Sequence, residues 1–190
     1  MAKLFGNLHL VLAVGVVAAL ALMFGFAESV AIDGNSIGRW LHLFFGILWI
    51  GLLYYFNFVQ VPGMPKIADE HKPAVTKTIA PSALFFFRWA ALLTVVTGLL
   101  IAMINGYLVN ALTFAGNPYE NLIGAGMWMA LIMAFNVWFI IWPAQKKVLG
   151  IVEASADEKA AAAPRALIAS RLNTLLSFPM MYAMVSANLG

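Results

Sequence analysis

The sequence predicts an all-α, polytopic membrane protein, a bundle of about five transmembrane helices. Of its 190 residues, 63% are hydrophobic and only 10% are charged, whereas a soluble globular domain carries roughly 25% charged residues. So few charges cannot cover the surface of a soluble protein of this size, and lipid is therefore the expected solvent. Apolar runs also recur at about the 20-residue length that a helix needs to cross the bilayer core.

The five predicted spans share this length and are bounded by polar or proline-containing connections; they cover residues 4–27, 37–61, 83–108, 122–142 and 167–187. The first follows Lys3 and is longer than the apolar region of a signal peptide, roughly 7–15 residues. Ala27-Glu28-Ser29 is also a poor cleavage site. We therefore expect a retained first helix.

Local signals set the ends of the other spans. Residues 33–36 could cap the second helix, which Pro62-Gly63 and Pro65 should end. The third should start at Pro81-Ser82, and the turn at 116–118 precedes the fourth. Pro143 should break or kink the end of the fourth helix, and Pro179 should kink the fifth. The connection at 148–164 is expected to be a short helix or a mobile loop.

The basic residues predict the orientation. They gather before the first span, between the second and third, and between the fourth and fifth, at Lys3, Lys66, Lys72, Lys77, Lys146, Lys147, Lys159 and Arg165. Because cytoplasmic loops are rich in Lys and Arg, the N-terminus should be cytoplasmic and the C-terminus outside. We see no internal repeat, so residues 1–190 are expected to form a single transmembrane domain.

Composition and motifs exclude several function classes. The net charge of +3 is small and its basic residues lie in connections, so no nucleic-acid partner is indicated. The absence of cysteine excludes disulfides, iron–sulfur clusters and thiolate metal sites. Every acid lies in a loop or at a helix end, and no catalytic triad, HExxH or phosphate loop occurs. Hydrolysis or phosphoryl transfer by this chain alone is therefore not expected.

His42 is the sharpest candidate for chemistry, since ionisable groups within membrane helices usually serve function. Gly46 and Trp49 follow it at helical spacing, and Arg39 lies three residues earlier. His42 could bind the iron of a haem b, Gly46 could let the porphyrin approach the backbone, and Arg39 could hold a propionate. The alternative is a His42 that hydrogen-bonds a neighbouring helix, with Arg39 as an interface anchor.

A second axial ligand for such a haem is not obvious. His9 lies near the other end of the first span, and His71 lies in a loop. Methionines on the side of His42 remain: Met23, Met103, Met127, Met129 and Met184. Most methionines in such a chain serve packing. The site could therefore be His/Met, five-coordinate, or completed by another subunit.

A second group of polar residues lies towards the other side of the predicted bundle: Arg88, Asn57, Asn136 and the segment Arg171–Thr174. These residues could line a pocket for a quinone or another substrate. The alternative is structural, because arginines near helix ends snorkel and Asn or Thr side chains hydrogen-bond between helices.

Four segments, in order, resemble the urate oxidase N-terminal membrane domain, found in bacterial urate-oxidising membrane proteins with a cytochrome c tail. They are Arg39-Trp40-Leu41-His42 with Gly46–Gly51 and Tyr54–Phe56; Phe87-Arg88-Trp89 with Thr97-Gly98; Asn136–Phe139 with Pro143–Lys147; and Arg171–Thr174 with Pro179 and Ser186. The resemblance covers about residues 37–188 and implies a bacterial inner-membrane protein.

The chain departs from this family at its histidines. Leu172 and Asn188 stand where the family has histidines, and another family histidine is replaced within 84–87. No CxxCH haem-attachment motif occurs. These losses argue against urate oxidation, and any electrons are expected to leave through another protein. A broader likeness to membrane haem proteins of the protoporphyrinogen oxidase kind, whose similar helix carries a haem ligand, implies haem b on His42.

Three functions remain open. The first is a haem b-binding redox or electron-transfer subunit with His42 as metal ligand. The second is a non-catalytic structural or assembly subunit of a larger membrane complex. The third, a small-solute transporter or channel, ranks last because the chain lacks buried charges and inverted repeats. Beyond the lipid bilayer, the expected partners are other membrane subunits.

Overall fold

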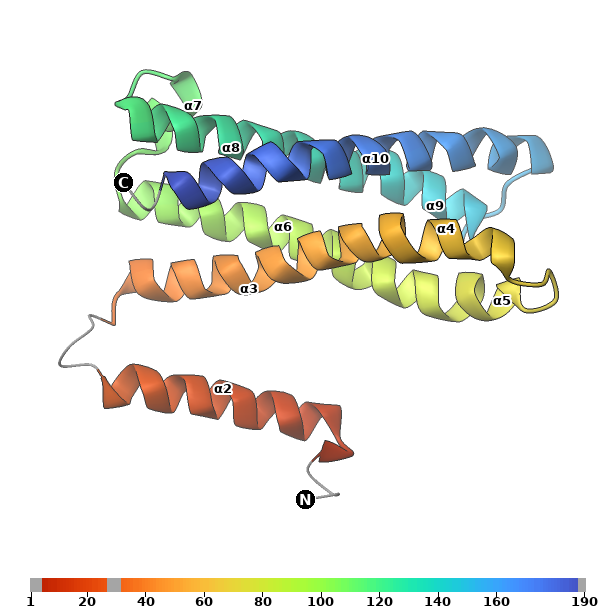
Figure 1. Ribbon diagram of the computed structural model, residues 1–190, viewed down its shortest axis with the longest axis horizontal. Coiled ribbons are helices and arrows are strands. Elements are labelled where there is room, and N and C mark those ends of the chain that lie inside the picture. Colours follow the sequence, from red (N-terminus) through yellow and green to blue (C-terminus); the bar gives the residue numbers. More distant parts are fainter. Residues whose placement is uncertain (1–4, 27–31, 188–190) are drawn as a thin grey trace. The chain divides into compact units, whose positions relative to one another are not determined.

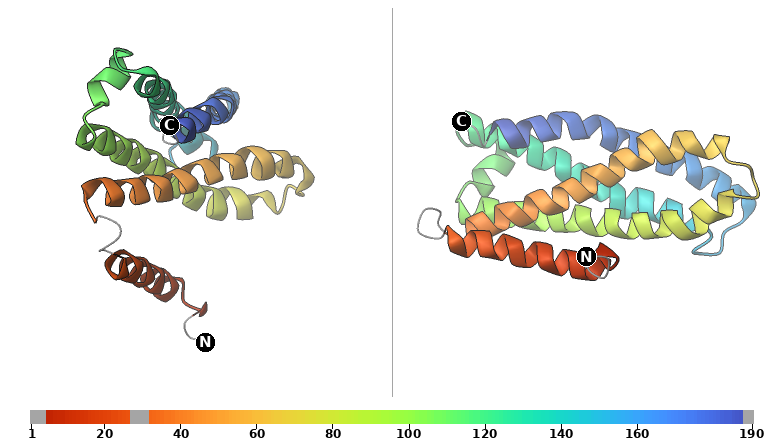
Figure 2. Two further views of the ribbon diagram at one scale, coloured as in Figure 1. Left: turned by 60° about the vertical axis from the view of Figure 1, so that its left-hand side comes forward. Right: turned by 60° about the horizontal axis from the view of Figure 1, so that its bottom comes forward.

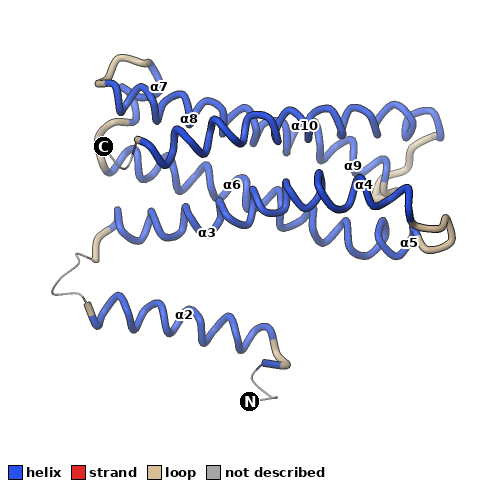
Figure 3. The backbone as a smooth tube through the Cα atoms, viewed as in Figure 1, coloured by secondary structure: helices blue, strands red, loops and turns tan. Residues whose placement is uncertain are grey.

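The computed structural model describes residues 5–26 and 32–187. Within these ranges every regular element is helical and no strand occurs (Figure 3). The chain divides into two compact units, Met1–Ile37 and Gly38–Gly190. The first contains α2 (Leu8–Gly25) and the second contains most of a helical bundle (Figure 1).

The helix α2 is apolar on all sides. Asn7 caps its start, where the side-chain oxygen accepts hydrogen bonds from the backbone N–H groups of His9 and Leu10 at 3.0 and 3.3 Å. None of its residues is buried. A helix with an apolar surface all round suits a lipid environment. The expected ends at residues 4 and 27 lie outside the described residues.

The second unit is formed by long helices that are made of shorter elements in succession. In chain order these are α3 (Gly34–Tyr54), η1 (Tyr55–Gln60), α4 (Val61–Gly63), η2 (Met64–Lys66), α5 (Lys72–Ala74), η3 (Val75–Ile79), α6 (Ala80–Ile104), α7 (Leu108–Thr113), α8 (Pro118–Phe135), η4 (Asn136–Ile141), α9 (Trp142–Val148) and α10 (Ala156–Ser186). The elements η1, η3 and η4 are π-helical, and η2 is a 3₁₀ turn.

The prediction of a helical membrane protein is confirmed. Among the described residues, four helices are long and apolar enough to cross a bilayer: Leu8–Gly25, Gly34–Lys66, Lys72–Ile104 and Pro118–Val148. The fifth expected span, 167–187, falls on the second part of α10 and is not one of these four, because this stretch carries Arg171 and Asn173 and is less apolar. Two views show α10, in blue, running beside α8 and α9 (Figure 2).

Several expected helix ends were wrong. The second helix does not end at Pro62 and continues to Lys66, while the third starts at Lys72, ahead of Pro81. The 148–164 connection is mostly helical, because α10 begins at Ala156. The expected loop 108–121 contains the short helix α7.

Pro62, Pro81 and Pro143 are accommodated by π-helical turns, which are wider than α-helical turns. Each π-helical segment ends two residues before a proline: η1 before Pro62, η3 before Pro81 and η4 before Pro143. In an α-helix, proline lacks the N–H donor and its ring clashes with the carbonyl four residues earlier. A π-turn supplies an extra residue at that point, so the helix continues.

Polar side chains of α10 join the helices at the centre of the bundle. Asn136 donates to the Asn173 side-chain oxygen at 2.8 Å, and Asn173 donates to the Met133 carbonyl at 2.9 Å. On the other side, the Tyr54 hydroxyl lies 2.9 Å from that of Ser177. Asn173 and Ser177 are fully buried. The long helix with the most polar sequence, α10, therefore turns the face that carries Asn173 and Ser177 towards the core.

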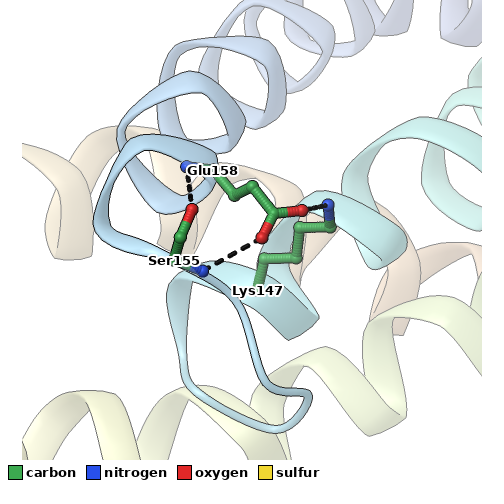
Figure 4. A network of polar contacts seen from close by, with 3 residues as sticks. All are labelled: Lys147, Ser155 and Glu158. Atoms are coloured by element: carbon green, nitrogen blue, oxygen red, sulfur yellow. Dashed lines mark hydrogen bonds and ion pairs between the residues drawn. The ribbon is translucent and has the colours of Figure 1, made fainter.

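The connection between α9 and α10 is held by a polar network (Figure 4). Ser155 and Glu158 form a capping box at the start of α10, and Lys147 donates to Glu158 at 2.7 Å. The Lys147 hydrogen bond, together with that from the Ser155 backbone, holds the pKa of Glu158 below its ordinary value. Figure 4 shows that this one carboxylate joins both helices.

Candidate functional site

His42 lies in the first half of α3 and faces α6. Its Nδ1 atom lies 2.9 Å from the Thr94 backbone carbonyl and 3.2 Å from the Thr97 hydroxyl. A carbonyl oxygen can only accept, so Nδ1 carries the proton and Nε2 carries the lone pair in the neutral ring. Among the described residues no hydrogen bond reaches Nε2.

Gly98 on α6 makes room for this imidazole. A Cβ atom at position 98 would lie 2.9 Å from His42 Cε1 and 3.2 Å from Nδ1. Real Cβ atoms essentially never approach a neighbour this closely, so a side chain here would displace the ring. The hydrogen bond to Thr94 and the missing side chain at Gly98 thus fix the ring together.

His42 lines a partly open cavity of about 460 Å³, here called the His42 pocket. A narrower hollow of about 30 Å³ shares four of its lining residues. The walls of the pocket are mostly apolar and come from α3, α6, α8, α10 and the turn before α7; they are Arg39, Trp40, His42, Leu43, Gly98, Ile101, Tyr107, Ile123, Met127, Met184 and Val185. Its volume lies within the roughly 300–1,000 Å³ of small-molecule and cofactor sites.

The structure separates the residues that the sequence grouped with His42. Arg39 is exposed and lines the pocket with His42. Gly46 is not among the lining residues, and a Cβ atom there would be 3.9 Å from Thr94, an ordinary contact. Trp49 is fully buried in the bundle core, where its indole N–H has no hydrogen-bond partner.

The candidate second ligands are also separated. Met127 and Met184 line the pocket, whereas Met103 and Met129 are absent from its lining. His71 is exposed beside Glu70, at 3.5 Å, and His9 and Met23 lie in α2, in the other unit. Among the described residues, no group of three or more His, Cys, Asp or Glu could hold a metal ion. This observation bears on metal sites that are built from several such side chains. It does not bear on haem, because a haem iron needs only one or two axial side chains.

Sequence reasoning did not place Gly98 or Tyr107 in the site. In the sequence, Gly98 stands out only as part of Thr97-Gly98, which resembles a segment of the family. The sequence does not show which residues these two contact, because Gly98 meets His42 and Tyr107 joins the same pocket only after distant helices pack. A glycine in a long apolar helix is a general pointer to close approach, and that is the one available signal.

The second polar group divides into two parts. Asn57, Asn136 and Asn173 take part in hydrogen bonds between or within helices, as the structural alternative predicted. Arg88 stands apart: its guanidinium lies 3.9 Å from the Trp142 ring centre and 5.3 Å from that of Phe85. A cation over an aromatic face is electrostatically favourable.

Comparison with known proteins supports one part of the expected resemblance. The model of the family described as urate oxidase N-terminal matches residues 112–190. The chain resembles the urate oxidase N-terminal family. The match covers α8 to α10, including Met127 and Met184 of the His42 pocket, while His42 itself lies outside it. No curated protein and no solved structure that was compared matches the chain.

Proposed function

We propose that this multi-pass membrane protein is a haem b-binding subunit that takes part in electron transfer, with His42 as an axial ligand. The observation that carries the proposal is the arrangement of the imidazole: Nδ1 is bonded to the Thr94 carbonyl, while Nε2 is unpaired on a residue that lines a cofactor-sized pocket. Histidines that bind metals almost always donate their other ring N–H to a carbonyl, carboxylate or water.

The residues of the pocket fit such a group. Its walls are apolar, as a porphyrin requires, and Arg39 supplies a cation for a propionate. Met127 and Met184 line the same pocket and would be the candidates to hold the group together with His42. A bound haem would supply reversible one-electron chemistry, while the chain fixes the orientation and tautomer of His42 and excludes water with apolar walls.

The same proposal includes the surroundings of the protein. We place it in a bacterial inner membrane because of its resemblance to the urate oxidase N-terminal family, and the distribution of its basic residues puts the N-terminus on the cytoplasmic side. The chain contains no cysteine, so electrons would pass to another membrane subunit and not to an iron–sulfur centre of its own. Single-cysteine variants at residue 3 and residue 110, labelled from either side of the membrane, test the orientation against a background without thiols.

The decisive measurement is the absorption spectrum of the purified protein, before and after haem reconstitution. We expect a Soret band that shifts on reduction. The variant His42→Ala should lose it, because the axial ligand is gone. The matched control His71→Ala changes an exposed histidine and should keep the band.

Two results would contradict the proposal, and the first of them would favour the alternative, a non-catalytic structural subunit. One is a clean, folded preparation with no Soret band even after reconstitution. The other is a band that survives His42→Ala at full intensity. Arg39→Leu gives an independent check, since loss of a propionate partner should weaken haem retention about tenfold without abolishing it.

A further inference from the structure

A second pocket is lined by residues of η1, α4, α6, η4, α9 and α10. Figure 1 shows α4 and α9 at the end of the bundle opposite to the start of α3. This pocket has a volume of about 190 Å³ and is here called the Gln60 pocket. Its lining residues carry no ionisable side chain; they are Phe56, Gln60, Val61, Leu84, Phe87, Ile141, Gln145, Val148, Ala163, Ala166, Leu167 and Ser170. Any ligand of this pocket should therefore be neutral.

Hydrogen-bonding groups in and beside the pocket lack partners. The Gln60 side-chain oxygen is buried and accepts no hydrogen bond. The side-chain oxygen of Asn57 is likewise buried and unpaired, although its amide donates to Ser170 at 2.8 Å. Each unsatisfied buried acceptor destabilises the folded state. Two such acceptors beside one cavity indicate a missing hydrogen-bond donor.

Water alone does not satisfy this site well. The volume exceeds what one water molecule needs, and every water in it would need two to four polar partners. The lining offers Gln60, Gln145 and Ser170 against nine apolar residues. Phe56 and Phe87 meet edge to face, with ring centres 5.5 Å apart. The walls therefore suit a mostly apolar ring that carries a few hydroxyl groups.

The backbone also marks this pocket. Phe56 and Gln60 belong to η1 and Ile141 to η4, so two π-helical segments contribute to one cavity. Such segments occur frequently at functional sites. Pro62 and Pro143 explain why η1 and η4 are π-helical. They do not explain why the side-chain oxygen of Gln60 has no hydrogen-bond partner in the cavity.

We propose that the Gln60 pocket binds the ring of a membrane quinol. The quinol hydroxyls would donate to the Gln60 oxygen, and the Ser170 hydroxyl, which accepts from Asn57, keeps its proton to donate to the ligand. The apolar tail would leave between Val61 and Leu167, two exposed apolar residues at the edge of the pocket. This site is independent of haem at His42.

The test measures equilibrium binding of radiolabelled decylubiquinol, and of its oxidised form, to the full chain in detergent. We expect saturable binding. The reduced form should bind more tightly, because the unpaired groups are the side-chain oxygens of Gln60 and Asn57, and only the quinol has hydroxyl groups that can donate to them. Gln60→Leu should weaken binding about tenfold, the loss of one well-placed hydrogen bond. Ala163→Phe should abolish it by filling the cavity.

Ala160→Phe is the matched control, since residue 160 is exposed on the same helix and does not line the pocket. It should bind like the wild type, as should His42→Ala, which affects only the haem site. The proposal is overturned if binding is not saturable, if Ala163→Phe binds normally while remaining folded, or if the oxidised form or decylbenzene binds as tightly as the quinol.

Discussion

The two ring nitrogens of His42 differ in environment, and this difference makes the residue a candidate ligand. Nδ1 is held by a backbone carbonyl that cannot move without disturbing α6. Nε2 is left without a partner among the described residues. The spacing of Arg39 and His42 in the sequence indicated a shared helix face, whereas the contacts with Thr94 and Gly98 came from packing.

Gly98→Ala should disturb the site more than its size suggests. The new methyl group would overlap His42 Cε1 at 2.9 Å and turn the ring away from Thr94. We expect haem retention to fall at least tenfold, measured by the Soret absorbance after purification. Gly46→Ala is the control, because its nearest neighbour would be 3.9 Å away. Equal haem content in both variants would contradict this account.

The Asn136–Asn173 pair should couple the helices energetically. Asn173→Leu removes the partner of the Asn136 amide and one of the hydrogen bonds that the Met133 carbonyl accepts, so we expect a loss of about 1–3 kcal/mol in unfolding free energy. The double Asn136→Leu/Asn173→Leu variant should lose less than the sum of the singles. Unfolding in bicelles measures the cycle, with exposed Asn110→Leu as the additive control. Full additivity of the pair would show that the hydrogen bond contributes nothing.

At the scale of elements, the repeated order of π-turn and proline decides how the long helices run. The turn widens just ahead of the proline, so the helix continues where sequence reasoning ended it. The extra residue in each turn also rotates everything beyond it by roughly 100° about the helix axis. Residues after η4, such as Lys147, therefore face α10.

Pro143→Ala tests this cause. Alanine restores the N–H donor and removes the clash, so we expect 136–141 to tighten into an α-helix. The resulting rotation should separate Lys147 from Glu158, which now lie 2.7 Å apart. Distances between spin labels at residues 139 and 161 would report it. An unchanged distance would mean that packing, and not the proline, holds the π-turn.

The junction of α9 and α10 should depend on pH. The pKa of Glu158 is lowered from its ordinary 4.5 by the Lys147 hydrogen bond. Its contribution is therefore complete above about pH 4.5 and lost as the pH falls through the lowered pKa. Amide exchange at the start of α10 should accelerate in that acid range. Glu158→Gln should remove the dependence, whereas Glu153→Gln, in the same connection, should preserve it.

For the whole molecule, the second unit has buried clusters of its own. These clusters are formed by residues within 49–180. The match to the urate oxidase N-terminal family likewise lies in the second unit. The second unit thus has its own core, and it also carries the family match.

Replacing residues 8–25 with leucine should therefore leave the bundle intact. The substitution keeps the span and its direction, and we expect the unfolding free energy to change by less than about 0.5 kcal/mol. Trp49→Ala is the contrasting control: it empties a fully buried site and should cost about 3–5 kcal/mol. Strong destabilisation by the leucine helix would show that α2 packs specifically.

The sequence by itself determined the solvent of this protein, the helical class and the approximate spans. Lipid requires apolar helices of a certain length, and that requirement is visible residue by residue. The sequence also identified His42 and Arg39, because an ionisable residue within an apolar run is conspicuous without knowledge of its partners. Asn57, Asn136 and the polar residues of α10 were found too, but their partners were not.

Only the tertiary structure decided which of these residues meet. Gly98 lies 56 positions after His42 in the chain, and Ser170 lies 113 positions after Asn57. Such pairs depend on how far π-turns rotate each helix and on how closely small residues let helices approach. It is also the packed bundle that makes Gln60 an unpaired acceptor in a cavity, since burial without a partner is a property of the surroundings and not of the residue.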